Sequence, residues 1–227
     1  MASRQKKSYN PGRKSWTNLF KKEKGIYFMS KLFWRLKRRL FDLFRDNYPF
    51  RDILEKENEN FRQLIEKADI KGKTVLDLGV GTGNVLFFLD SASKSYGLDF
   101  TESMLKQAKE RFPEAGYVKA KAQSLPFKSN SLDVITAVGL VEYVKDIIPI
   151  VEESCRVLKK DGYFLLTFSP KNIWTRLRVL LGHPVYARKL GQLESVIKFC
   201  HFEVCECMES MMQNQVLLKK SVNCEND

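Results

Sequence analysis

The chain has 227 residues, 44% of them hydrophobic, which is enough for one α/β domain with a buried core and an appendage. No apolar run approaches the roughly 18 residues of a membrane span, and the basic N-terminus does not resemble a secretory signal, so we expect a cytoplasmic protein. The net charge of +12 lies entirely in residues 1–51, where 15 basic side chains outnumber three acidic ones. This asymmetry predicts an anionic partner for that segment alone.

The N-terminal part divides into a tail and two helices. Residues 1–24, rich in Lys, Arg, Ser and Asn, are predicted to be a mobile tail. Residues 27–45 have helical periodicity, with apolar side chains along one stripe and mostly basic ones opposite. Pro49 ends this helix, and an acidic helix is expected over residues 52–67. We assign residues 25–70 to a helical segment that acts as a lid or docks on a membrane.

From residue 71 onward, short apolar strands alternate with helices, which predicts a parallel, doubly wound sheet of the Rossmann-like α/β class. Strands are expected at residues 74–79, 95–99, 117–119, 132–137 and 163–168. Helices are expected from about Asn84, from Thr101 as N-cap, and over residues 144–158 with Gly162 as terminator. Two further strands, at 202–208 and 214–219, follow each other directly and predict an antiparallel hairpin at one sheet edge. Residues 71–221 are thus expected to form one domain.

The five cysteines are odd in number and give no disulfide framework. Cys205 and Cys207 lie near His201, but a single residue between two thiols is not the spacing of structural zinc. Because side chains two positions apart in a strand share a face, we interpret them as two buried thiols on one face. No metal site is predicted.

The sequence DLGVGTG, which begins at Asp77, closes a strand and carries the chemistry. A dinucleotide loop would be G-x-G-x-x-G, with its third glycine seating a pyrophosphate at a helix N-terminus. Here Gly79, Gly81 and Gly83 are spaced G-x-G-x-G, and Asn84 stands where that third glycine would be. The carboxylate of Asp77 suits a cationic ligand and would repel a phosphate.

Two further stretches carry a resemblance to a known family. Asp99 ends the next strand, 22 residues after Asp77, where a carboxylate can accept hydrogen bonds from ribose hydroxyls; NAD enzymes use an acid similarly. With DFTESML from Asp99, AQSLPF from Ala122 and SLDVI from Ser131, the loop resembles the class I S-adenosylmethionine-dependent methyltransferases. Within them it is similar to the branch of the ubiquinone and menaquinone biosynthesis methyltransferases. The resemblance covers about residues 73–160.

The resemblance implies S-adenosyl-L-methionine as cofactor. The cofactor-binding residues it assigns are Asp77, Gly79, Gly81 and Gly83 for the methionine end, Asp99 for the ribose, Phe100 for the adenine face, Ala122 with Gln123 for the adenine edge, and Gly139 for the floor near the methyl group. The family often has an acid where this chain has Lys121, which leaves recognition of the adenine amino group open. Simpler interpretations stay open too: the glycines can serve a tight turn, Asp99 can cap the next helix, and Gln123 can be a solvated loop residue.

Methyl transfer from a sulfonium is an in-line displacement, so the enzyme mainly aligns the nucleophile and excludes water. A general base is needed only when the nucleophile holds its proton tightly. The predicted fold places His183 and His201 away from the cofactor. Glu142 and Tyr143 follow the fourth strand and are the candidates for a catalytic role, Tyr143 at a position where many relatives carry histidine. Packing or capping is the favoured explanation of both, and no base is assigned.

The two segments added to the predicted domain, residues 25–70 and 169–190, are apolar-faced and basic. They favour a small-molecule acceptor that is hydrophobic or lipid-like. They also favour binding of residues 27–45 to an anionic surface at the inner face of a membrane. The alternative is an RNA or protein methyltransferase that grips its substrate with the basic segment. It is less favoured, because only Trp34 and Phe41 lie among the charges, where RNA would require exposed aromatics. A cofactor-binding protein without catalysis is a third possibility. The acceptor and the oligomeric state are not predicted.

Overall fold

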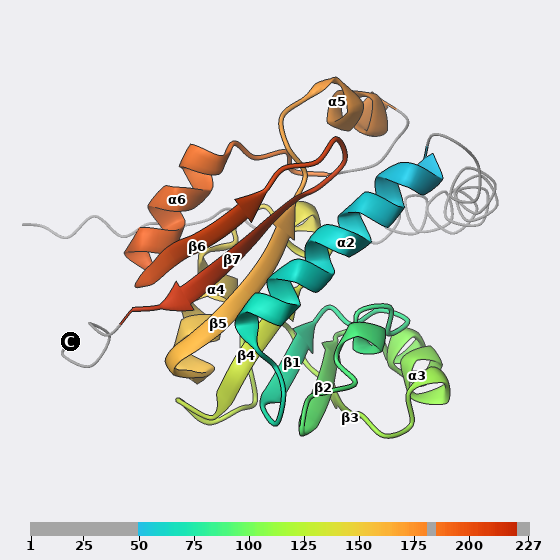
Figure 1. The fold of residues 1–227 in the computed structure, drawn as a ribbon, viewed down its shortest axis with the longest axis vertical. Helices are drawn as coiled ribbons and strands as arrows, with labels where there is room; N and C mark the ends of the chain where they lie inside the picture. The colour runs from blue at the N-terminus through green and yellow to red at the C-terminus, as the bar shows by residue number, and fades with distance from the viewer. Residues whose placement is uncertain (1–49, 181–184, 222–227) are drawn as a thin grey trace, which may run out of the picture. The chain divides into compact units, whose positions relative to one another are not determined.

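The computed structural model describes residues 50–180 and 185–221 (Figure 1). The predictions for the tail, for the helix over 27–45, for Pro49 and for His183 fall outside the described residues. The described residues from Asp52 onward belong to one compact unit. Within the described part of the chain, no helix is both long and apolar enough to cross a bilayer. The domain boundaries at residues 24 and 70 stay predictions.

Seven strands form one mixed sheet. They are β1 (Thr74–Leu78), β2 (Lys94–Asp99), β3 (Gly116–Lys119), β4 (Leu132–Ala137), β5 (Leu158–Phe168), β6 (Phe202–Met208) and β7 (Asn214–Lys220). Their order in the sheet is β3-β2-β1-β4-β5-β7-β6. The first five are parallel, whereas β7 runs antiparallel to both β5 and β6. The predicted doubly wound sheet with a C-terminal hairpin at one edge is confirmed.

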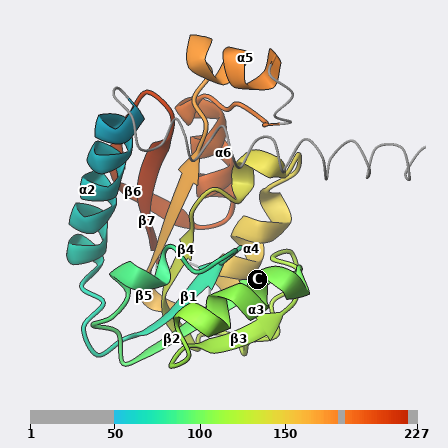
Figure 2. The ribbon, with the colours of Figure 1, turned by 90° about the vertical axis from the view of Figure 1, so that its right-hand side faces the viewer.

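Helices cover both faces of the sheet. α2 (Phe50–Ala68) packs on one face, together with α3 (Glu102–Arg111). α4 (Ile148–Val157) and α6 (Leu190–Phe199) pack on the other. Figure 2 shows α2 and α6 on opposite sides of β6 and β7. α5 (Ile173–Leu180) covers neither face and projects beyond the end of β5 in both views (Figures 1 and 2).

The helix predicted from Asn84 is wrong. The chain after Gly83 forms turns and one short 3-10 helix, η1 (Leu86–Phe88), before β2 begins at Lys94. The segment is short, and its second half reads DSAS from Asp90; Asp and Ser side chains can compete for backbone hydrogen bonds and favour turns over helices. A single short helical turn therefore separates β1 from β2.

The helix predicted over residues 144–158 is shorter than expected, and its predicted terminator is wrong. α4 begins at Ile148, whose N–H donates to Asp146 Oδ1 at 3.1 Å, and it ends at Val157. Gly162 instead lies inside β5, at an irregularity in its pairing with β4. A Cβ at Gly162 would lie 2.9 Å from the Lys159 carbonyl oxygen. Close approach of backbone, and not helix termination, requires this glycine.

The prediction of two buried thiols on one strand face is also wrong. Cys205 is exposed and Cys207 is half-buried. The register of β6 against β7 shifts between Val204 and Glu206, so Cys205 is the extra residue of a bulge. The bulge resets the alternation of side chains, and only Cys207 packs against the core cluster on the α6 side. Among the described residues, no group of three potential ligands could hold a metal ion.

Candidate functional site

The predicted binding residues converge at one edge of the sheet. Gly79 follows β1, Asp99 ends β2, and Gly139 follows β4, which pairs with β1 on the side opposite β2. The chain therefore leaves neighbouring parallel strands in opposite directions at this point. Ligands of doubly wound sheets bind in the crevice at such a switch point, outside the carboxyl ends of the strands.

The glycine turn is held against the end of β2 by its own backbone. The N–H groups of Gly79 and Val80 donate to the Leu98 carbonyl oxygen at 2.8 and 3.0 Å. Gly79, Gly81 and Gly83 have φ values of +71°, +53° and +87°, in the left-handed region that other residues avoid. A Cβ at Gly83 would also lie 2.9 Å from the ring of Phe112. The turn thus requires glycine for conformation and, at Gly83, for space.

Asp99 closes the turn and keeps capacity for a ligand. Its side chain is 8% exposed; Oδ2 accepts the Gly81 N–H at 3.1 Å and Oδ1 accepts the Thr101 N–H at 2.7 Å. Thr101 stands at the N-cap of α3, but its hydroxyl makes no capping hydrogen bond. Each carboxylate oxygen has a second lone pair, so Asp99 can order this loop and still accept two hydroxyl groups. The capping and ligand-binding interpretations are compatible.

Asp77 is a buried carboxylate with one unused oxygen. The residue is 1% exposed, and Oδ1 accepts the hydroxyl of Thr136 on the neighbouring strand at 2.7 Å. Oδ2 has no hydrogen-bond partner among the described residues. Burial raises the pKa of Asp77 to about 7, which the Thr136 hydrogen bond opposes and the charge of Asp99 reinforces. Because a buried polar atom without a partner is unfavourable, a cationic group placed at Oδ2 would be stabilising.

The remaining predicted residues lie around this edge. Phe100 is 72% exposed, so its ring is free to stack on a flat ligand, and Gln123 is exposed beside buried Ala122. Lys121, in place of the expected acid, is also exposed. Gly139 has a φ of +67°, and its N–H donates to Thr167 Oγ1 at 2.9 Å.

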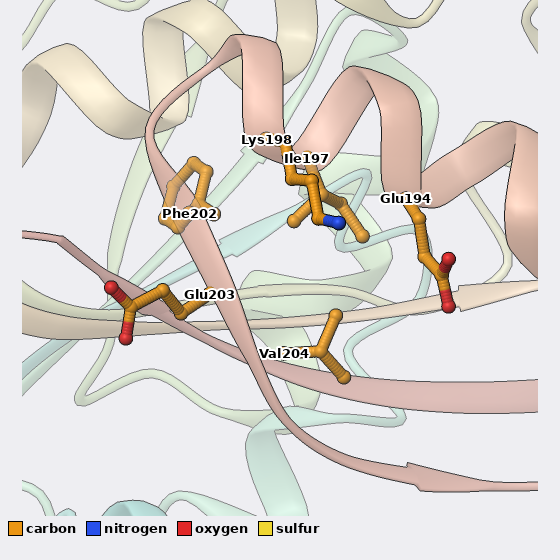
Figure 3. Close-up of a pocket in the computed structure, with 6 residues that line it drawn as sticks. All are labelled: Glu194, Ile197, Lys198, Phe202, Glu203 and Val204. Carbon is orange, nitrogen blue, oxygen red and sulfur yellow. The ribbon is translucent and has the colours of Figure 1, made fainter.

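A shallow cavity of about 290 Å³ lies elsewhere, between α6 and β6 (Figure 3). It is lined by Glu194, Ile197, Lys198, Phe202, Glu203 and Val204. Since β6 runs in the same direction as β5, its first residues lie at the amino ends of the parallel strands. This cavity is therefore at the opposite end of the sheet and is not part of the site.

Comparison with known proteins agrees with this geometry. Residues 76–166 match the family described as "Methyltransferase domain". This region is similar to the class I S-adenosylmethionine-dependent methyltransferases. The predicted family and the predicted cofactor, S-adenosyl-L-methionine, are thereby confirmed at the level of this domain, and both the unused oxygen of Asp77 and the glycine turn fit that cofactor.

The methyltransferase domain has relatives of several kinds. The chain is 33% identical over 132 residues to the uncharacterized methyltransferase YcgJ of Bacillus subtilis, covering 55% of this chain and 50% of that protein. It is 34% identical over 111 residues to the ubiquinone/menaquinone biosynthesis C-methyltransferase UbiE of Campylobacter jejuni, covering 45% and 46%. The magnesium protoporphyrin IX methyltransferase ChlM of Synechocystis has a similar structure, with a TM-score of 0.68 at 17% identity over 86% of this chain and 97% of that one. The chain spans about half the length of the curated relatives it matches.

The turn after β4 is where the two catalytic candidates lie, in the short helix η2 (Val141–Tyr143). Glu142 is 4% exposed, and both of its oxygens are engaged: Ser169 Oγ donates to one, and Arg178 Nη2 donates to the other at 3.2 Å. Tyr143 is 41% exposed, and burial together with the charge of Glu142 raises its pKa to about 12. Tyr143 therefore keeps its proton, and both oxygens of Glu142 are already hydrogen-bonded. Neither residue is thus available as a general base.

Sequence reasoning missed the residues that hold this turn. Arg188 donates to the carbonyl oxygens of Val141, at 2.8 Å, and Val144, and Arg178 reaches Glu142 from α5. In the sequence, the only indication of Arg178 and Arg188 was that residues 169–190 are basic. Thr136 was also missed, although pairing β1 with β4 places this buried hydroxyl directly beside Asp77.

We expect cofactor affinity to rise about tenfold between pH 5.5 and pH 7 as Asp77 ionises. The folded-state pKa is raised, so protonated Asp77 stabilises the unliganded protein at low pH, and this contribution is lost as the pH rises through about 7. A cationic ligand prefers the carboxylate and therefore binds more tightly at the higher pH.

The interval from pH 5.5 to pH 7 lies below the range, roughly 7.7–8.0, in which a ligand's own α-amino group titrates. Calorimetric titration with S-adenosylhomocysteine should show the rise, and Asp77→Asn should abolish it. A pH-independent wild-type affinity would contradict the assignment.

Proposed function

We propose that the protein transfers a methyl group from S-adenosyl-L-methionine to a small-molecule acceptor that is hydrophobic or lipid-like. The observation that carries the cofactor part is the buried oxygen of Asp77, which has no hydrogen-bond partner in the described part of the chain and lies beside a glycine turn that closes on Asp99. In this proposal Asp77 and the glycine turn hold the methionine end, Asp99 the ribose, and Phe100 the adenine face. Ala122 and Gln123 hold the adenine edge, and Gly139 lies at the floor near the methyl group.

The mechanism relies on positioning. The bound cofactor supplies an electrophilic methyl group on a sulfonium. The chain aligns the acceptor for in-line attack and excludes water, which is worth roughly 7–11 kcal/mol in well-oriented systems. Tyr143, with its raised pKa, can donate a hydrogen bond to the acceptor. Since Glu142 is occupied by Ser169 and Arg178, we propose an acceptor whose nucleophilic atom loses its proton without a protein base.

Two observations support a small, apolar acceptor. α5, which follows β5 at the site's end of the sheet, carries exposed apolar side chains. The names of two relatives also refer to small molecules, since one acts in quinone biosynthesis and the other on magnesium protoporphyrin IX. We further propose that residues 27–45 bind an anionic membrane surface, which would give the protein a peripheral place at the inner face of a membrane.

Two measurements test this function. S-adenosylmethionine and S-adenosylhomocysteine are expected to bind in calorimetry, whereas NAD is not, because the turn lacks the third glycine of a phosphate loop. In a single turnover with cell extract and methyl-labelled cofactor, label should enter the fraction soluble in organic solvent. Label in RNA or protein would favour the alternative, a macromolecular substrate gripped by the basic segment. Binding of NAD without any response to S-adenosylhomocysteine would contradict the assignment of the cofactor, on which the whole proposal depends.

A further inference from the structure

The apolar side chains of α5 point away from the domain. Ile173, Leu177 and Leu180 share one helix face and are 75%, 45% and 82% exposed. The opposite face turns inward and is polar: Thr175 is 1% exposed, and the Arg178 side chain 21%. A surface helix normally buries its apolar stripe and exposes its polar one, so the amphipathicity of α5 is inverted.

Specific polar contacts fix this orientation. Arg178 binds Glu142 and also donates to Ser169 Oγ at 3.1 Å. At the start of the helix, Asn172 Oδ1 accepts the Thr175 N–H at 2.9 Å, and its amide group donates to the Met211 carbonyl oxygen at 2.8 Å. The helix is thus tied down through its polar face, and the apolar face is held outward.

The segment that carries the exposed face has charge of one sign. Residues 169–190 contain five basic side chains and no acidic one. Two of the five, Arg178 and Arg188, are bound to the η2 turn. The other three, Lys171, Arg176 and Lys189, are exposed. An exposed apolar face on a segment whose charged side chains are all cationic complements an anionic lipid surface, in whose interface such helices lie.

We propose that α5 is the surface through which the domain docks on an anionic bilayer. Its apolar face enters the acyl-chain boundary, and Arg176 on α5, with Lys171 and Lys189 in the flanking segments, lies at the level of the lipid phosphates. α5 follows β5 and is tied to the η2 turn, so docking would bring that end of the sheet to the bilayer (Figure 2). The further step, that a lipid-like acceptor enters there, rests on the proposed function. The docking itself does not.

Trp174 on α5 is a built-in reporter. The full chain has three tryptophans, and Trp16→Phe with Trp34→Phe leaves Trp174 alone. On vesicles of phosphatidylcholine with phosphatidylglycerol, its emission should shift to the blue and be quenched by bromine-labelled acyl chains. Vesicles of phosphatidylcholine alone should have little effect, because the cations then lack a partner.

A pair of matched variants tests the face itself. Ile173→Ser with Leu180→Ser should lower the vesicle partition coefficient at least about tenfold, since two apolar side chains no longer enter the lipid. Phe199→Ser with Val204→Ser removes exposed apolar side chains from α6 and β6 and should leave partitioning unchanged. Neither double variant alters charge, so the attraction of the other basic segments to lipid is the same in both.

Three outcomes would overturn the docking proposal. One is vesicle binding by the full chain with unchanged Trp174 emission, and another is equal partitioning of the two double variants. The third is a lipid-independent blue shift that grows with protein concentration, which would make the face an interface between copies. Affinity for S-adenosylhomocysteine, measured without lipid, separates this test from the proposed function. Its absence in the wild type would contradict the methyltransferase assignment and leave the docking result standing.

Discussion

Replacement of Asp99 with alanine is expected to lower the affinity for S-adenosylhomocysteine by about 100-fold or more. A hydrogen bond to a charged group contributes about 1.5–3 kcal/mol, and the proposed role of Asp99 is to accept two from the ribose. The same carboxylate also accepts the N–H groups of Gly81 and Thr101, so the variant loosens the turn that carries the methionine end. Isothermal calorimetry with S-adenosylhomocysteine measures the loss.

A carboxylate at the other end of the sheet provides the matched control. Asp133 accepts the Thr74 N–H at 2.9 Å and pairs with Lys159, so Asp133→Ala also removes an acceptor of backbone hydrogen bonds. It should leave affinity for S-adenosylhomocysteine unchanged. Asp99→Asn, which keeps one acceptor oxygen, should give an intermediate loss. If folded Asp99→Ala binds as tightly as the Asp133 control, the ribose assignment is wrong, and Asp99 serves the turn alone.

The cofactor end of the site could be predicted because its determinants are local. Each buried parallel strand is a short apolar run, and each predicted ligand lies within a few residues of the carboxyl end of a strand. Parallel strands bring their carboxyl ends to one edge, so the fold alone assembles Asp77, Asp99 and Gly139. The sequence did not predict the protonation state of Asp77. Complete burial raises its pKa, and the hydrogen bond from Thr136, which is 59 residues away, opposes that rise.

The features that escaped prediction depend on tertiary geometry. The bulge in β6 moves Cys205 out of the alternation that the sequence implies, and no residue in the strand marks its place. Residues 169–190, which include α5, were predicted to have an apolar face, but periodicity does not tell which face turns inward. That is decided by Arg178, which binds a carboxylate 36 residues earlier in the chain. Such pairings appear only when the fold is known.

Arg178→Met is expected to lower the free energy of unfolding by about 3 kcal/mol. Glu142 keeps only 6% of its side chain exposed, and the variant leaves its charge buried without a cation. The value is at the lower end for a broken buried pair, because the Arg178 side chain is 21% exposed. Chemical denaturation measures the loss. Lys119→Met, which breaks a solvent-exposed pair with Glu102, should have a much smaller effect.

Two further measurements connect this loss to the pair itself. Arg178→Met combined with Glu142→Gln should recover much of the stability, because the unpaired charge is gone. The deficit of the single variant should also grow as the pH rises through the titration of Glu57. Burial raises the pKa of Glu57, and the positive charge of Arg178 lowers it. Without Arg178 the pKa of Glu57 rises further, so at a pH above that pKa the ionised Glu57 destabilises the fold.

A single variant as stable as wild type would show that α5 is held without the ion pair. A double variant no more stable than the single one would show that Arg178 acts by packing, because relief of the charge on Glu142 would then have changed nothing.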